Sequence, residues 1–266
     1  MDRTLKQKFR QPFGFYMENL IGRHLTTKGI FTMYHAHSYA FEWGLDLNDE
    51  DLNQLKFLIN ILEINTGELS ERVRLVLKGN NGYYNQTYAE LIRRNFSFKD
   101  NKKLFNKKII LLAVSDLISS NILELLRIED HRLIVSEVKS QYGPKVDYRI
   151  EFERSQLNRL LTLTNTGIET SLIYCIALPA PRFVEIPFIK LYEEFTKYTD
   201  FNGREFTTDN WADLRIKIPL EYRKDEKFER IHESLYSFKD EKSLYKSILD
   251  AFPGKFSRLE KFLNLF

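Results

Sequence analysis

A carboxylate and an amine lie two residues apart near the end of an apolar run that begins at Leu133. The pair is Glu137 and Lys139, with Val138 between them. Because side chains alternate between the two faces of a β-strand, the acid and the amine would share one face. A carboxylate suits a hard cation such as Mg²⁺, and a neighbouring ammonium group can orient or activate an attacking water. The pair could therefore support metal-assisted hydrolysis of a phosphodiester, or it could be an ordinary charge-compensated strand face.

The segments around this pair predict alternating strands and helices. Three apolar runs predict strands, and these are 109–114, 121–128 and 132–140. Residues 129–131 predict a polar turn before the last of them. Ser155 could cap a helix over 155–161, because apolar residues follow it at helical spacing and Thr166–Gly167 would end it. The continuous apolar run over 171–178 then predicts a strand buried on both faces.

This order of elements, over residues 66–190, resembles the PD-(D/E)XK nuclease superfamily, which includes many restriction enzymes and repair nucleases. In that family a hairpin carries an aspartate on its first strand and (D/E)-x-K on its second, before a helix and another strand. The resemblance implies an α/β, restriction-endonuclease-like fold with a mixed central sheet flanked by helices. It implies a nuclease-like core over 66–198, an N-terminal helical and aromatic region over 1–65 that could bind DNA, and a mostly helical extension over 199–266.

The resemblance also implies a role for each site residue. Asp116, Glu137 and the Val138 carbonyl would bind Mg²⁺, for which Mn²⁺ would substitute. Lys139 would orient or activate the attacking water. Gln156, on the helix after the motif strand, would contact the metal-bound water or a phosphate. These roles predict a Mg²⁺-dependent deoxyribonuclease of the restriction, recombination, repair or defence type.

Two acidic positions have alternative interpretations in this alignment. The family's Pro-Asp corresponds to Ser115-Asp116, which lies between two apolar runs, and Asn121 offers an alternative alignment at which an amide would replace the acid. An amide is a poorer cation ligand than a carboxylate. Glu71, in a predicted helix over 66–78, is the counterpart of an accessory acid of some relatives, and its alternative role is that of a surface glutamate near a helix start.

A basic segment with interleaved aromatic residues precedes the motif hairpin. Its cations are Arg93, Arg94, Lys99, Lys102, Lys103, Lys107 and Lys108. Such a segment could bind the phosphates of DNA. The alternative is a solvated loop that precedes a strand, in which the lysines serve solubility.

The region before this segment has a helical pattern that permits a different function. Helices are predicted over 49–62, 66–78 and 86–94, since apolar residues recur at spacings of three and four. Three short helices followed by strands could form a winged-helix unit whose third helix enters the major groove of DNA. The alternative function is therefore a winged-helix protein, or a catalytically impaired nuclease fold, that acts in DNA binding or assembly.

Composition sets the remaining expectations. The chain has 266 residues, a formal net charge of +3 and 43% hydrophobic residues, which suffice for a packed interior. No apolar run approaches the length of a membrane span, and the N-terminus carries no apolar signal segment, so we expect an intracellular, cytoplasmic protein. The single cysteine, Cys175, lies in an apolar run and is expected in the core. A homodimer or a larger nucleoprotein assembly would suit cutting of both strands of a duplex.

Overall fold

The computed structural model describes residues 3–34, 44, 46–80, 86–97, 99–120, 122–143, 148–195 and 216–252. The chain divides into two compact units, one of Met1–Gly29 with Val135–Phe266 and one of Ile30–Ile134, which are called here the first and the second unit. The described part is α/β, with eight α-helices and a mixed six-stranded sheet. The predicted α/β class is therefore confirmed. A restriction-endonuclease-like arrangement remains a prediction.

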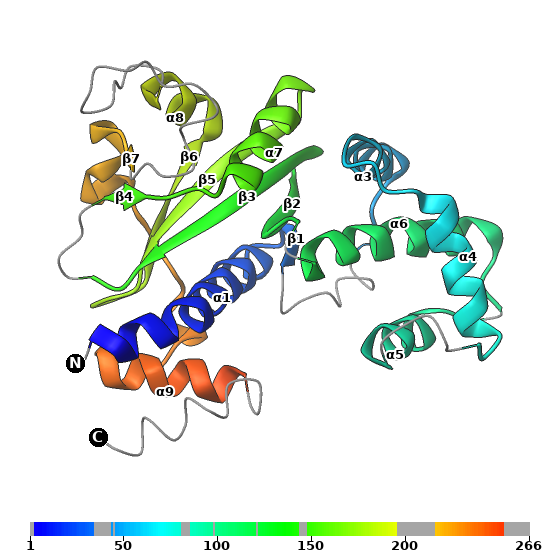
Figure 1. Cartoon of the computed structure of the whole chain (residues 1–266), viewed down its shortest axis with the longest axis horizontal. Coiled ribbons are helices and arrows are strands. Elements are labelled where there is room, and N and C mark those ends of the chain that lie inside the picture. Colours follow the sequence, from blue (N-terminus) through cyan, green and yellow to red (C-terminus); the bar gives the residue numbers. More distant parts are fainter. Residues whose placement is uncertain are drawn as a thin grey trace. The chain divides into compact units, whose positions relative to one another are not determined.

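The second unit combines one edge of the sheet with a group of helices. Strand β1 (Phe31–Tyr34) pairs antiparallel with β2 (Leu125–Glu129), so that Phe31 lies opposite Ile128. The helices of this unit are α3 (Asp49–Ile61), α4 (Thr66–Leu77), α5 (Gln86–Asn95) and α6 (Lys102–Ser119). Figure 1 shows α3 and α4 beside α6, against which both pack.

The long helix α6 overturns the strand predicted over 109–114. Residues 109–115 of α6 are all buried. A helix that is buried on every side has no polar face, so its sequence is a continuous apolar run that periodicity cannot distinguish from a buried strand. The helix begins after Asn101, whose side-chain oxygen accepts the Leu104 N–H at 2.8 Å. The basic segment, for which a solvated loop was the alternative interpretation, therefore extends from the end of α5 into the first half of α6.

The predicted turn before the motif strand is confirmed. Asp130 and His131 join β2 to β3 (Arg132–Gln141), and both have left-handed backbone conformations, with φ of 50° and 59°. Two such residues are what a two-residue hairpin turn of type I′ requires. Gln54 of α3 holds this turn, because its amide donates to the His131 carbonyl at 2.5 Å and accepts the Leu133 N–H at 2.9 Å.

The first unit holds the rest of the sheet. Its helices are α1 (Arg3–Thr27), α7 (Arg154–Asn165), α8 (Phe188–Phe195) and α9 (Glu241–Ala251). Its further strands are β4 (Arg149–Ile150), β5 (Glu169–Ile176), β6 (Arg182–Pro187), β7 (Ile216–Lys217) and β8 (Glu229–Arg230). Beyond β3 the strand order is β5-β6-β8, and β4 pairs separately with β7. Helices α1 and α9 pack together in this unit.

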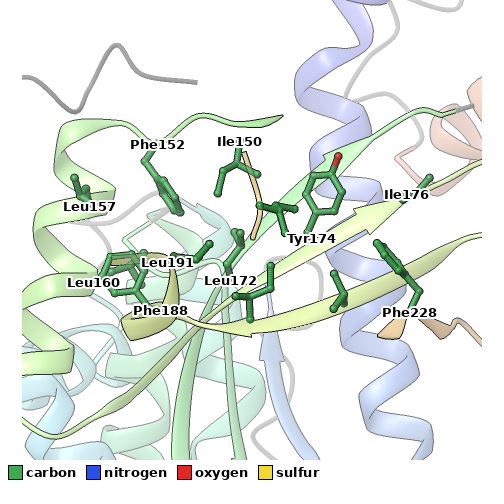
Figure 2. Close-up of a cluster of buried hydrophobic side chains, with 13 residues drawn as sticks. Ile150, Phe152, Leu157, Leu160, Leu172, Tyr174, Ile176, Phe188, Leu191 and Phe228 are labelled. Carbon is green, nitrogen blue, oxygen red and sulfur yellow. The ribbon is translucent and has the colours of Figure 1, made fainter. Parts of the chain in front are cut away.

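One apolar cluster joins the sheet to α7 and α8. Figure 2 shows Leu172 and Tyr174 of β5 among side chains from both helices, including Leu157 and Phe188. Strand β5 is buried from its second residue to its last, as the sequence predicts for a strand covered on both faces. Cys175 is fully buried there, which confirms its expected place in the core.

The prediction of a mostly helical extension over 199–266 is wrong for part of the described residues. From residue 220 to 235 the chain forms short 3₁₀ helices and strand β8 rather than amphipathic α-helices, and α9 follows. A 3₁₀ helix of three to four residues is too short to show a helical period in the sequence. Among the described helices, none combines the length and the hydropathy that a bilayer crossing would need.

Core packing predicts the cost of removing Leu172. Its side chain is fully buried, so Leu172→Ala should lower the free energy of unfolding by about 2–5 kcal/mol, through lost burial and the cavity left behind. Denaturant unfolding followed by circular dichroism would measure this change. The same replacement at Leu220, which is 74% exposed, is the matched control and should change little. Equal effects of the two variants would contradict the assigned core.

Candidate functional site

The structure brings three of the predicted site residues together in the first unit. The Lys139 ammonium donates to Glu137 Oε1 at 2.7 Å and to Gln156 Oε1 at 3.1 Å. Glu137 and Lys139 lie on β3, and Gln156 lies near the start of α7. One ammonium group therefore links a strand carboxylate to a helix amide.

The acid of this group is almost completely buried. The Glu137 side chain is 3% exposed and the Lys139 side chain 21% exposed. Removing a carboxylate from water is costly unless an opposite charge and hydrogen bonds compensate it. The ammonium of Lys139 supplies that compensation, and its partial exposure keeps one side of the pair accessible to solvent.

Gln156 is fixed by the way α7 begins. The N-cap of the helix is Glu153, and not Ser155 as predicted. With this N-cap, Gln156 occupies the third helical position and completes a capping box, which favours this start of the helix. Gln156 Oε1 accepts the Glu153 N–H at 3.0 Å as well as the Lys139 ammonium. The amide oxygen is thus held from two directions, so its orientation is set before any ligand binds.

Phe152, which the sequence analysis missed, supports the ammonium from a further side. The Lys139 Nζ atom lies 5.5 Å from the centre of the Phe152 ring, at a cation–π distance. Phe152 precedes the helix cap and belongs to the same buried cluster as Leu157. An apolar residue before the cap with another at the fourth helical position is the hydrophobic-staple pattern, and this spacing could have identified Phe152.

Oxygen atoms of this site are chemically suited to a Mg²⁺ ion. Glu137 offers a carboxylate, and the neighbouring Val138 offers a backbone carbonyl. Mg²⁺ commonly takes only one or two carboxylates and keeps water or substrate phosphate as its other ligands. Among the residues that the structure describes, no group of three or more His, Cys, Asp or Glu side chains could hold a metal.

The two other predicted acids lie in helices of the second unit. Asp116 lies in α6 and not on a hairpin strand. Glu71 lies in α4, is 60% exposed and pairs with Arg74 at 3.7 Å, as expected of a surface glutamate. Asn121, the alternative to Asp116, lies outside the described residues. Glu124, which the sequence analysis did not select, immediately precedes β2 and is partly buried.

Glu124 is a second candidate for the first acidic position of the motif. The resemblance predicts that acid on the first strand of a hairpin, and Glu124 stands immediately before β2, the first strand of the hairpin seen here. Counting back from the turn at Asp130 and His131, and not from the apolar run over 109–114, would have identified it. Glu124 and Asp116 are therefore both retained as candidates.

The basic segment divides into paired and groove-lining cations. The Lys108 ammonium pairs with Asp100 at 2.8 Å in a largely buried position and lies 5.7 Å from the centre of the Phe96 ring. Arg94 pairs with Glu90 on the surface of α5. Arg93 and Lys99 are exposed. The remaining cations line one groove, and these are Lys102, Lys103 and Lys107. Of these, Lys103 also contacts Asp49, and Lys107 donates to the Leu47 carbonyl at 2.8 Å.

Comparisons with protein-family models, curated proteins and solved structures found no match to this chain.

The Lys139–Glu137 contact predicts a large loss of stability when the cation is removed. Lys139→Met leaves a buried carboxylate without its partner, which should cost about 3 kcal/mol of unfolding free energy. Replacing both residues, as in Glu137→Gln with Lys139→Met, should recover most of that loss. Denaturant unfolding at neutral pH measures both. A Lys139→Met protein as stable as the native one would contradict the burial of this pair.

Replacing Asp116 is expected to stabilise the protein, by an amount that depends on pH. Burial raises the pKa of the Asp116 carboxyl above its ordinary value of 3.8, and the charge of Arg72 opposes this only in part. The folded state therefore holds this proton more tightly than the unfolded state, and its contribution to stability is lost as pH rises through the raised pKa. Asp116→Asn should stabilise the protein at pH 7, and the gain should vanish below pH 3.8. Thermal unfolding across this range measures it, and a loss of stability at pH 7 would contradict it.

Proposed function

We propose that this chain is a metal-dependent nuclease that hydrolyses DNA phosphodiester bonds. The observation that carries the proposal is the Lys139 ammonium, held between the Glu137 carboxylate and the Gln156 amide. A purely structural ion pair needs only the first of these contacts. The added amide, fixed by the helix cap, makes an ordered polar group that also includes a carboxylate suited to a hard cation.

Each residue has a distinct role in this proposal. Glu137 and the Val138 carbonyl would hold Mg²⁺ or Mn²⁺, which when bound supplies positive charge that acidifies water and offsets charge on the phosphate. Lys139 orients the attacking water and places a positive charge near the phosphate oxygens. Gln156 holds the ammonium in position through its amide oxygen. Preorganisation of this kind lowers the barrier because the groups do not need to reorient during the reaction.

The resemblance also predicts a second acid, for which both candidates belong to the second unit. Asp116, suggested by the resemblance, lies in α6, whereas Glu124 stands at the head of β2. Both are carboxylates and could bind a hard cation. The choice between them decides how the hairpin of this chain corresponds to that of the family.

One other function deserves a test. A nuclease fold that binds DNA without cutting it is favoured by the lack of a group of three or more potential metal ligands among the described residues. A winged-helix protein has less support, because α5 is followed by the long helix α6 where that fold would place strands.

Cleavage assays test the proposal directly. Labelled duplex, single-stranded, flapped and four-way-junction DNA would be incubated with the native protein and Mg²⁺ or Mn²⁺. Lys139→Ala should lower the rate by about a hundredfold or more, as expected for loss of a positioned charge, while DNA binding in EDTA remains. Lys246→Ala, an exposed lysine of α9, is the matched control and should cut normally. Native-like cutting by Lys139→Ala would exclude the proposed site.

Two further variants identify the second acid. Glu124→Gln and Asp116→Asn each remove one carboxylate with little change in size. The acid that binds metal should lose cutting when replaced and should need more Mn²⁺ to recover it, whereas the other variant should cut at the native rate. Normal cutting by both variants would mean that neither is the missing ligand. Tight DNA binding by the native protein with no cutting of any substrate would favour the binding-only alternative.

A further inference from the structure

A groove of about 390 Å³, open to solvent, lies between helices α3 and α6 of the second unit. Eight residues line it, and these are Asp49, Leu52, Lys56, Lys102, Lys103, Asn106, Lys107 and Ile110. Leu52 and Ile110 are buried and give the groove apolar surface. Most of the other lining residues carry a positive charge, so the groove combines an apolar part with basic walls.

The charge of the groove is strongly unbalanced. Of the residues that the structure describes, four lysines line it against a single aspartate, Asp49. That aspartate contacts Lys103 at 3.4 Å, but the two side chains are 73% and 71% exposed. An exposed pair of this kind is weak and is screened by salt, so it leaves most of the positive charge available to a ligand.

The cations on the two walls come from separate parts of the sequence. Lys56 lies on α3, and Lys102, Lys103 and Lys107 lie on α6. The sequence analysis selected the three lysines of α6 but not Lys56, because only folding brings it to the same groove. By contrast, Lys108 belongs to the same basic segment but is neutralised by Asp100 and does not line the groove.

Lys102 and Lys103, in the first turn of α6, also stand where a positive charge is unfavourable. The N-terminal end of a helix carries the positive end of its dipole, and the first turn of α6 contains no acidic residue. Cations clustered there repel one another and the dipole. An anion bound in the groove would reduce the repulsion among the lysines and their repulsion by the helix dipole, so the groove favours a negatively charged partner.

We propose that the α3–α6 groove binds the sugar-phosphate backbone of a nucleic acid strand. Lys103 and Lys107 are one turn apart, a rise of about 6 Å along α6, which is comparable with the separation of neighbouring phosphates on a strand. Lys102 and, from the opposite wall, Lys56 can contact the same phosphates, the Asn106 amide can donate to a phosphate oxygen, and Leu52 offers apolar contact to a sugar. Contacts of this type position a strand without reading its sequence.

The inference deepens the proposed function, on which it rests for its choice of a nucleic acid as the partner. It assigns backbone binding to residues that take no part in the Glu137–Lys139–Gln156 group. Binding and cleavage are therefore expected to respond to different substitutions, and each can be measured without the other.

Binding of the full chain to a fluorescent oligonucleotide in EDTA tests the groove. The variant Lys56→Gln with Lys102→Gln removes one cation from each wall and should weaken binding about tenfold. Because each lost phosphate contact reduces the salt dependence, the slope of log K against log salt should fall by about two. The matched control is Lys78→Gln with Lys246→Gln, which removes two exposed lysines outside the groove and should bind like the native protein.

A variant that gains affinity guards against effects of misfolding. Asp49→Asn removes the one carboxylate that lines the groove among the described residues, so it should strengthen binding severalfold and increase the salt dependence. Unchanged binding by the Lys56, Lys102 double variant, or weaker binding by Asp49→Asn in a folded protein, would overturn the proposal. Polyglutamate that competes as well as DNA, with the same dependence on the two lysines, would also overturn it in favour of an acidic protein partner.

The same series separates this inference from the nuclease proposal. Glu137→Gln should leave binding in EDTA unchanged, whereas the groove variant should weaken it. Native cutting combined with normal binding by the groove variant would refute the groove alone. A different result would support the groove and refute the nuclease. In that case the groove variant loses binding, and the native protein binds DNA but cuts no substrate.

Discussion

The ion pair of Glu137 and Lys139 is the interaction on which the candidate site depends. Glu137 lies in the middle of β3 and is almost fully buried, which a carboxylate tolerates only with a partner of opposite charge. Lys139 provides that partner two residues later on the same strand. The ammonium must therefore remain in place for the strand to be stable. Its position next to the carboxylate is a condition of folding, so it exists before any substrate binds.

The surroundings of the pair restrict the ammonium further. The helix cap of α7 fixes the Gln156 amide, and the apolar cluster fixes Phe152 next to the same cation. Leu157 and Leu172 hold α7 and β5 in that cluster, so core packing and the geometry of the site are coupled. A site of this kind loses precision when its supporting side chains loosen, because oriented groups contribute most when they are preorganised.

The sequence predicted the local elements of the site better than their context. Strand alternation placed Glu137 and Lys139 on one face, and the turn at Asp130 and His131 followed from polar residues between apolar runs. The apolar run over 109–114 was assigned to a strand because a fully buried helix gives the same pattern. That error shifted attention to Asp116 and away from Glu124. Long-range features, such as Lys56 joining the lysines of α6, have no local signal and needed the fold.

The Glu137–Lys139–Gln156 group and the α3–α6 groove differ in how far their positive charge is compensated. Lys139 is compensated by a buried acid and an amide, which fixes it as a single oriented group. The groove instead gathers four lysines, of which Lys103 contacts an exposed aspartate and Lys107 donates to the Leu47 carbonyl. Such a cluster of positive charge suits a flexible, screened polyanion. A nuclease requires both properties, one for chemistry at a single bond and one for holding a strand.

The measurement that tests the central claim most directly is a time course of DNA cleavage by the native protein and by Glu137→Gln, with Mg²⁺ and with EDTA. The account predicts cutting by the native protein with Mg²⁺ only, and none by the folded variant under either condition. Metal-dependent cutting by Glu137→Gln at the native rate would contradict it, because the buried carboxylate would then have no part in the reaction.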